Sequence, residues 1–212
     1  MVNHTTRAEQ KQHTQKRILK AIAQIISQEG FTGVTMARVA ELTGLSRGMC
    51  NYHFETKEQV MIDVLKMIYE EHEAIWKSVI DDATKSPAEK ISELVEVLLS
   101  KPFATEETLS IWQAYWGVPQ YRQMYLKICT EGDRAYEDSI EELLSLLAKG
   151  QHEIKGIPIK ELSVAFTGII DGMHTEYLIA PGRLSSKNAI KACYVYLASF
   201  FPEFEPFVEK DG

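Results

Sequence analysis

A short stretch of the sequence carries polar side chains that could reach into a groove of double-stranded DNA. Arg47, Asn51 and Tyr52 all lie within residues 47–52. Guanidinium and amide groups pair with base edges, and all three side chains can bind phosphate oxygens. Gly48 has no side chain and would let a helix approach the groove floor closely. We expect Arg47 to read a base.

The neighbouring residues predict the elements that would present these side chains. Thr35 can cap a helix whose apolar residues include Met36 and Val39, and Gly44 breaks that helix. Ser46 can cap a further helix that reaches about His53. Two short helices joined by a three-residue turn have the spacing of a helix-turn-helix.

A basic, amphipathic helix is predicted before this motif, over residues 14–29. Its apolar residues recur with helical period, and Gly30 follows in the usual C-terminal position. Basic side chains lie on its outer face and in the tail before it: Arg7, Lys11, Lys16, Arg17 and Lys20. They could approach a phosphate backbone, although a solvated surface accounts for such charges equally well.

The rest of the chain also has helical periodicity, interrupted by glycine and proline. The fourth helix, over residues 57–80, would be roughly 36 Å long and could link two domains. Five more helices are predicted over residues 87–99, 105–117, 119–149, 159–179 and 185–201. We find no convincing strand, so the predicted fold is all-α with about nine helices. An N-terminal DNA-binding domain would occupy residues 1–56, and a ligand-binding and dimerisation domain residues 57–212.

The charge distribution supports this division. The chain has a net charge of −7, which by itself argues against a nucleic-acid ligand. Residues 1–60, however, carry 8 Lys and Arg against 5 Asp and Glu, a balance of +3, whereas residues 61–212 carry 15 against 25, a balance of −10. The basic part coincides with the predicted DNA-binding domain.

Several other classes of protein do not fit the sequence. His72-Glu73 and His152-Glu153 begin like zinc-protease motifs but lack the second histidine, and there is no phosphate loop or nucleophile elbow. The cysteines, Cys50, Cys129 and Cys193, are too far apart for a paired zinc site and odd in number. We therefore expect no catalytic residue, no metal and no cofactor. Without an apolar run long enough to span a membrane or a signal peptide, the expected location is the cytoplasm.

The segment from Val34 to Val60 resembles the DNA-binding signature of TetR-family repressors in residue type, order and spacing, including the Tyr52-His53-Phe54 ending with Lys57. The resemblance covers about 50 residues, from Thr14 to Val60. It implies that phosphates are held by Thr35, Ser46, Tyr52, His53 and Lys57. Many members have an aromatic residue where this chain has Asn51, so no operator sequence can be transferred from them.

The C-terminal part resembles the choline-responsive BetI group through Leu109–Gly117 and the tyrosine-containing helix that follows. In that group a tryptophan-rich sixth helix lies by the effector cavity, and Trp112, Tyr115 and Trp116 occupy the matching stretch here. A quaternary ammonium is held by aromatic faces with help from a carboxylate, and Trp112 and Trp116 share one helix face. Further candidate ligand-binding residues are Trp76, Tyr121 and Tyr125, with Asp171, His174, Glu176 or Tyr177 contributing from the eighth helix. Ordinary core packing accounts for such an aromatic stripe equally well.

The resemblance also implies a homodimer formed by the last two long helices, whose small and apolar residues suit close packing of helices across a two-fold axis. Two recognition helices would then face successive major-groove turns roughly 34–36 Å apart, on a palindromic operator. Three alternatives stay open: the effector is apolar or an acyl compound, the regulator has no small-molecule effector, or it activates transcription. Asp171 could serve either the ligand or the dimer interface.

Overall fold

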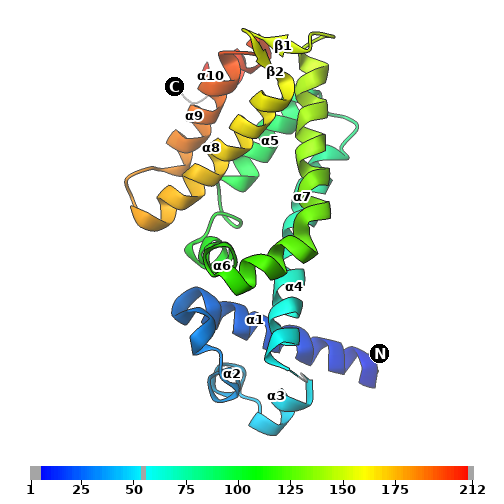
Figure 1. The fold of residues 1–212 in the computed structure, drawn as a ribbon, viewed down its shortest axis with the longest axis vertical. Helices are drawn as coiled ribbons and strands as arrows, with labels where there is room; N and C mark the ends of the chain where they lie inside the picture. Colours follow the sequence, from blue (N-terminus) through cyan, green and yellow to red (C-terminus); the bar gives the residue numbers. More distant parts are fainter. Residues whose placement is uncertain (1–5, 54–55, 210–212) are drawn as a thin grey trace, which may run out of the picture. The chain divides into compact units, whose positions relative to one another are not determined.

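The computed structural model describes residues 6–53 and 56–209 and is almost entirely helical (Figure 1). Its α-helices are α1 (Arg7–Gly33), α2 (Met36–Thr43), α3 (Arg47–His53), α4 (Lys57–Ile80), α5 (Pro87–Leu98), α6 (Glu106–Gly117), α7 (Pro119–Leu147), α8 (Ile159–Ile179), α9 (Ser186–Ala198) and α10 (Glu205–Glu209). The prediction of an all-α fold is confirmed. α4 and α8 begin and end where the sequence pattern placed them.

The chain divides into two compact units, which are described separately. The first unit contains the described residues up to Glu71 together with Ser110–Ile128, and the second contains His72–Leu109 and the described residues from Cys129 onward. α4, α6 and α7 each contribute to both units. Residues 57–71 pack in the first unit, beyond the predicted domain boundary at residue 56. That boundary was placed just before the predicted fourth helix and stays a prediction.

α1 forms the core of the first unit with one apolar face. Ile18, Ile22 and Ile25 are fully buried, as their spacing of three and four residues predicts. The helix starts seven residues earlier than the apolar pattern indicates, because Thr6 and Glu9 form a capping box in which each side chain accepts the other residue's backbone N–H. Gly30 has a φ of 69° and interrupts the helix as expected.

α2 and α3 form the predicted helix-turn-helix in the first unit. The Thr35 hydroxyl accepts the Arg38 N–H at 3.2 Å, and the Ser46 hydroxyl accepts the Met49 N–H at 3.1 Å, so both helices begin at the expected caps. Gly44 lies in the turn with a φ of 67°, a left-handed conformation that suits glycine. Cys50 is fully buried, which agrees with a structural role.

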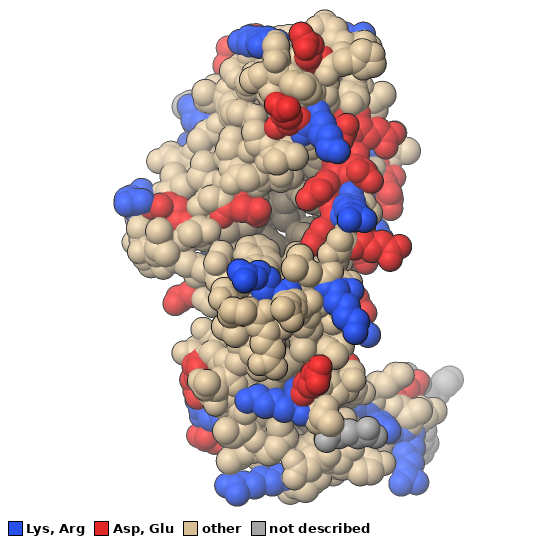
Figure 2. Space-filling model, viewed as in Figure 1, with Lys and Arg blue, Asp and Glu red and all other residues tan. Residues whose placement is uncertain are grey.

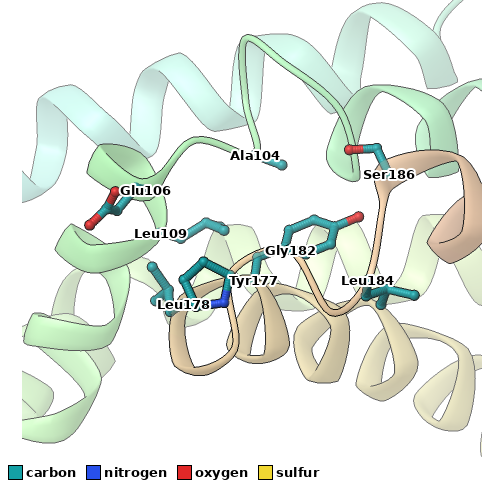
Figure 3. Close-up of a pocket in the computed structure, with 9 residues that line it drawn as sticks. Ala104, Glu106, Leu109, Tyr177, Leu178, Gly182, Leu184 and Ser186 are labelled. Atoms are coloured by element: carbon teal, nitrogen blue, oxygen red, sulfur yellow. The ribbon is translucent and has the colours of Figure 1, made fainter.

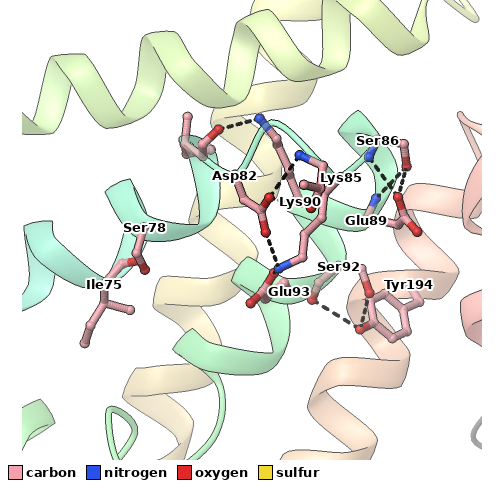
Figure 4. A network of polar contacts seen from close by, with 12 residues as sticks. Ile75, Ser78, Asp82, Lys85, Ser86, Glu89, Lys90, Ser92, Glu93 and Tyr194 are labelled. Atoms are coloured by element: carbon pink, nitrogen blue, oxygen red, sulfur yellow. Dashed lines mark hydrogen bonds and ion pairs between the residues drawn. The ribbon is translucent and has the colours of Figure 1, made fainter.

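The second unit is built around a core shared by α5, α7, α8 and α9. Leu94, Ile140 and Phe166 are fully buried where these helices meet. A polar network borders this core (Figure 4): Lys85 forms ion pairs with Asp82 and Glu93, while the hydroxyl groups of Ser92 and Tyr194 are 2.8 Å apart. Figure 2 shows Asp and Glu side chains gathered along the outer side of α7.

Two small features were not predicted. The first is an antiparallel pair of two-residue strands, β1 (Glu153–Ile154) and β2 (Ile157–Pro158), joined by Lys155 and Gly156 with positive φ. Strands this short have no alternating pattern that could be detected. The second is a C-terminal turn, η1 (Pro202–Phe204), which leads into α10 and buries Phe204 in the core of the second unit.

Among the residues that the structure describes, no helix is long and apolar enough to cross a membrane. Nor do the described residues contain a group of three or more His, Cys, Asp or Glu side chains arranged to hold a metal ion.

Candidate nucleic-acid interface and aromatic clusters

α3 presents a polar, exposed face in the first unit. Arg47, Gly48 and Asn51 are exposed, and Tyr52 has 72% of its surface accessible, whereas Cys50 on the opposite side is fully buried. A Cβ atom added to Gly48 would meet nothing closer than the Ser46 hydroxyl oxygen, at 3.9 Å. The protein's own packing therefore does not require glycine at position 48.

The residues expected to hold phosphates lie at the starts of α2, α3 and α4 and at the end of α3. Thr35 and Ser46 are exposed, and their oxygen atoms accept capping hydrogen bonds, which leaves each hydroxyl hydrogen to donate outward. The rings of Tyr52 and His53 meet edge to face, with centroids 5.5 Å apart. The Lys57 ammonium donates to the Phe31 carbonyl at 3.0 Å and has two further N–H groups.

A pocket of about 250 Å³ lies next to these residues in the first unit. Its lining includes Asn51 of α3, Lys57 of α4 and Val34, which lies between α1 and α2. Phe54, the last residue of the Tyr52-His53-Phe54 part of the motif, lies outside the described residues.

Four aromatic side chains form a cluster in the first unit, here called the tryptophan cluster: Tyr69, Trp112, Trp116 and Tyr125. Trp112 and Trp116 face each other with centroids 6.1 Å apart and an interplanar angle of 26°. Tyr125 meets both indoles edge to face at 6.2 and 5.9 Å, and Tyr69 meets Trp112 at 6.2 Å. The structure thus brings together three of the predicted ligand-binding residues.

Two other predicted residues take part in the packing of the first unit. Tyr115 is fully buried, and its hydroxyl donates to the Met61 carbonyl at 2.8 Å. Tyr121 stacks on Phe31 with centroids 3.6 Å apart, and Phe31 also meets Tyr115 at 5.0 Å. These contacts tie α6 and the start of α7 to the end of α1.

A second aromatic group lies in the second unit, here called the histidine cluster: His72, Trp76, Phe103, Tyr136 and His174. The rings follow one another from Trp76 to Tyr136 at 5.5 Å, to His72 at 6.3 Å, to Phe103 at 5.1 Å and to His174 at 5.7 Å. Trp76 and His174 were predicted, whereas the other three were not. The spacing of His72 and Trp76, one helical turn apart on α4, is a signal that could have identified His72.

Burial keeps the two imidazoles of this cluster neutral. It lowers the pKa of His72 to about 4, and the repulsion that His72 would meet from a protonated His174 contributes to that shift. Burial also lowers the pKa of His174, whose Nε2 lies 2.8 Å from the Leu98 carbonyl oxygen. The indole N–H of Trp76 is buried and has no hydrogen-bond partner among the described residues. A buried donor without an acceptor is unfavourable by about 1–3 kcal/mol.

Two carboxylates interact near the histidine cluster. Asp171 is exposed on α8, but partial loss of its surrounding water and, to a lesser extent, the charge of Asp133 hold its pKa above the ordinary value. Burial raises the pKa of Tyr136, and the charge of Asp171 adds to the effect. Asp133 was not predicted, although it precedes Tyr136 by three residues on α7. The pair places negative charge beside aromatic rings, which is the chemistry of a cation site.

Tyr177, the last of the predicted ligand residues, lines a separate pocket in the second unit (Figure 3). This pocket has a volume of about 250 Å³ and lies between the start of α6 and the end of α8. The Tyr177 hydroxyl donates to the Leu99 carbonyl at 3.3 Å. Leu109 and Leu184 make much of its wall apolar, and Glu106 is its only carboxylate among the described lining residues.

Comparison with known protein families agrees with this architecture. A model of the C-terminal domain of BetI-type transcriptional repressors matches residues 87–202, and a model of bacterial regulatory proteins of the tetR family matches residues 18–64. The chain belongs to the TetR family, with a BetI-type C-terminal domain. It is therefore a DNA-binding transcriptional regulator, and the predicted family is confirmed.

Individual relatives resemble different parts of this TetR-family regulator. A BetI regulator of Chromohalobacter salexigens is 22% identical over 193 residues, which cover 86% of this chain and 87% of the relative. The transcriptional repressor NicS of Pseudomonas putida is 40% identical, but only over 63 residues, or 30% of each chain.

Solved structures share the fold. A protein of Saccharomonospora viridis described as a transcriptional regulator and solved in complex with choline has a TM-score of 0.71 at 19% identity, covering 88% of this chain and 96% of its own. AibR in complex with isovaleryl coenzyme A and operator DNA has a TM-score of 0.66 at 17% identity, covering 89% of this chain and 98% of its own.

Proposed function

We propose that this protein is a repressor that binds a palindromic operator as a homodimer and leaves it when a small cation binds. The observation that carries the DNA-binding part is the exposed face of α3, where Gly48 has no packing role within the protein. The regulator would act by binding alone, without catalysis, in the cytoplasm where the bacterial chromosome lies.

In this proposal α3 enters the major groove and Arg47 reads a base edge. The hydroxyl groups of Thr35 and Ser46 and the side chains of Tyr52, His53 and Lys57 bind phosphates and fix the register of the protein on the duplex. Arg47→Ala should weaken operator binding by roughly 1–3 kcal/mol and relax sequence selectivity. Retained selectivity would remove Arg47 from the base-reading role.

The proposed dimer uses the exposed surface of α8 and α9. Val164 and Val195 are 60% and 52% exposed, and added Cβ atoms at Gly168 and Gly172 would meet nothing within 4 Å. Exposed apolar residues beside small ones allow helices to pack closely across a two-fold axis. Val164→Lys should therefore reduce the mass measured by analytical ultracentrifugation to that of a monomer.

The proposed effector is a quaternary ammonium such as choline. The BetI-type domain and the choline-bound structural relative support this class, and the structure offers aromatic rings in both units with a carboxylate pair next to the histidine cluster. A hydroxyl group on the ligand would provide the acceptor that the buried Trp76 N–H lacks among the described residues. The complex of AibR with an acyl coenzyme A keeps an acyl effector as the second candidate.

Tryptophan fluorescence can test the effector and locate it. The chain has three tryptophans, one in the histidine cluster and two in the tryptophan cluster. Choline should change the emission in a saturable way. If the histidine cluster holds the ligand, Trp76→Phe should abolish most of that change, whereas dependence on Trp112 and Trp116 would assign it to the tryptophan cluster. A change caused only by isovaleryl coenzyme A would replace the cation by the acyl alternative.

A further inference from the structure

The first two turns of α1 lie outside the hydrophobic packing of the first unit. Residues 7–13 are all exposed, and the Thr6–Glu9 capping box fixes the start of this segment. Arg7 and Lys11 are one helical turn apart and share a face. Neither forms an ion pair with a carboxylate among the described residues.

A specific contact places this segment beside the end of the recognition helix. The Lys11 ammonium lies over the Tyr52 ring, 5.7 Å from its centroid. Tyr52 is the penultimate residue of α3, and its ring is largely exposed. An ammonium over an aromatic face is attracted by the ring quadrupole, so the contact favours a position of Lys11 at the edge of the polar α3 face.

The other basic residues of α1 are arranged differently. Arg17 donates to the Thr43 carbonyl at 2.5 Å, which satisfies the C-terminal end of α2. Lys16 lies 4.0 Å from a carboxylate oxygen of Glu71. Lys20 is exposed but follows Lys11 by nine residues, which at 3.6 residues per turn places it on the opposite side of the helix.

We infer that Lys11 and Arg7 bind backbone phosphates that flank the bases facing α3, so that the DNA-contacting surface extends onto the first two turns of α1. The ligand is the phosphate backbone of duplex DNA, because two cations on one exposed helix face adjoin the polar α3 face. This inference rests on the proposed function, since it requires that α3 faces DNA.

Salt dependence tests the inference, because each phosphate contact contributes about −0.9 to the slope of log K against log salt concentration. Lys11→Gln should make the slope shallower by about 0.9 per protomer, or about 1.8 for a dimer on its operator. At about 0.1 M salt this corresponds to weaker binding by about eightfold per contact. Lys20→Gln is the matched control: the same charge is removed from the other side of the same helix, and the slope should not change.

Further variants separate phosphate binding from a loss of folding and test the role of the Tyr52 ring. Arg7→Gln should also reduce the slope, and Lys11→Gln should keep the wild-type melting temperature because Lys11 is exposed. If the Tyr52 ring holds Lys11 in place, Lys11→Gln should change the salt slope less in a Tyr52→Leu protein than in the wild type. In a Tyr52→Phe protein, which keeps the aromatic face, Lys11→Gln should change the slope as much as it does in the wild type.

Two results would overturn the inference while leaving the proposed function standing: Lys11→Gln and Arg7→Gln both retaining the wild-type slope, or Lys20→Gln reducing the slope as much as Lys11→Gln does. The second result would show only a general effect of net charge. If the wild-type protein itself binds operator and scrambled duplexes equally, the proposed function fails first.

Discussion

Replacing Gly48 by alanine should improve the fold and damage the function. Glycine inside a helix is less stable than alanine by roughly 0.5–1 kcal/mol. A Cβ at position 48 would make its nearest contact at 3.9 Å, so α3 should accept the methyl group without strain. For a chain of this length we expect the melting temperature to rise by about 1–4 °C. If Gly48 lies against the groove floor, the methyl group should weaken operator binding at least about tenfold, or about 1.4 kcal/mol.

Gly44→Ala provides the matched control in the same motif. Gly44 has a φ of 67°, where an alanine is unfavourable by roughly 1–2 kcal/mol, so the same chemical change should lower the melting temperature. Thermal unfolding followed by circular dichroism and fluorescence anisotropy with labelled operator would measure both effects. Operator affinity in Gly48→Ala equal to that of the wild type would refute the argument that glycine is present for DNA.

Three further predictions concern stability and effector binding. The pKa of His72 falls from 6.5 to about 4 on folding, so up to about 3 kcal/mol of stability should be lost as the pH falls from 6.5 to 4. In urea titrations, the free energy of unfolding of His72→Gln should depend less on pH than that of the wild type. Because the pKa of Asp171 is raised, its ionisation disfavours folding as the pH rises above 3.8. Urea titrations at pH 7 should therefore find Asp171→Asn at least as stable as the wild type. Calorimetry should find that the same variant binds choline more weakly. Tyr115→Phe removes the hydrogen bond to the Met61 carbonyl and should lower the free energy of unfolding by about 1 kcal/mol, measured by urea titration; an unchanged value would show that water replaces the bond.

The sequence predicts the helices well because their boundaries depend on local chemistry. Gly44 needs its left-handed conformation and Ser46 its capping hydrogen bond regardless of the rest of the fold. The start of α1 was not predicted, because residues 7–13 are exposed and lack the apolar periodicity that marks the rest of the helix. The Thr6–Glu9 capping box is a local signal that could have located it.

The aromatic residues were harder to assign, because their partners come from distant parts of the chain. Trp112 and Trp116 were paired correctly, since one turn of α6 separates them. The contacts of Trp76 with Tyr136 and of His174 with Phe103 depend on how α4, α7, α8 and the turn before α6 pack together, which no spacing within one helix reveals. Tyr115 is aromatic and lies between Trp112 and Trp116 in the sequence, yet it is buried in the core, where its hydroxyl donates to the Met61 carbonyl.

The most direct test of the proposed function is a single anisotropy titration on a labelled palindromic fragment from the region upstream of the gene, at fixed salt, followed by addition of choline. The proposed function predicts binding that a scrambled duplex of equal length does not match, and a choline-dependent loss of affinity of about 5- to 150-fold, the usual range of coupling between two sites. Equal affinity for both duplexes would contradict sequence-specific DNA binding. Specific binding that choline leaves unchanged would contradict the cationic effector.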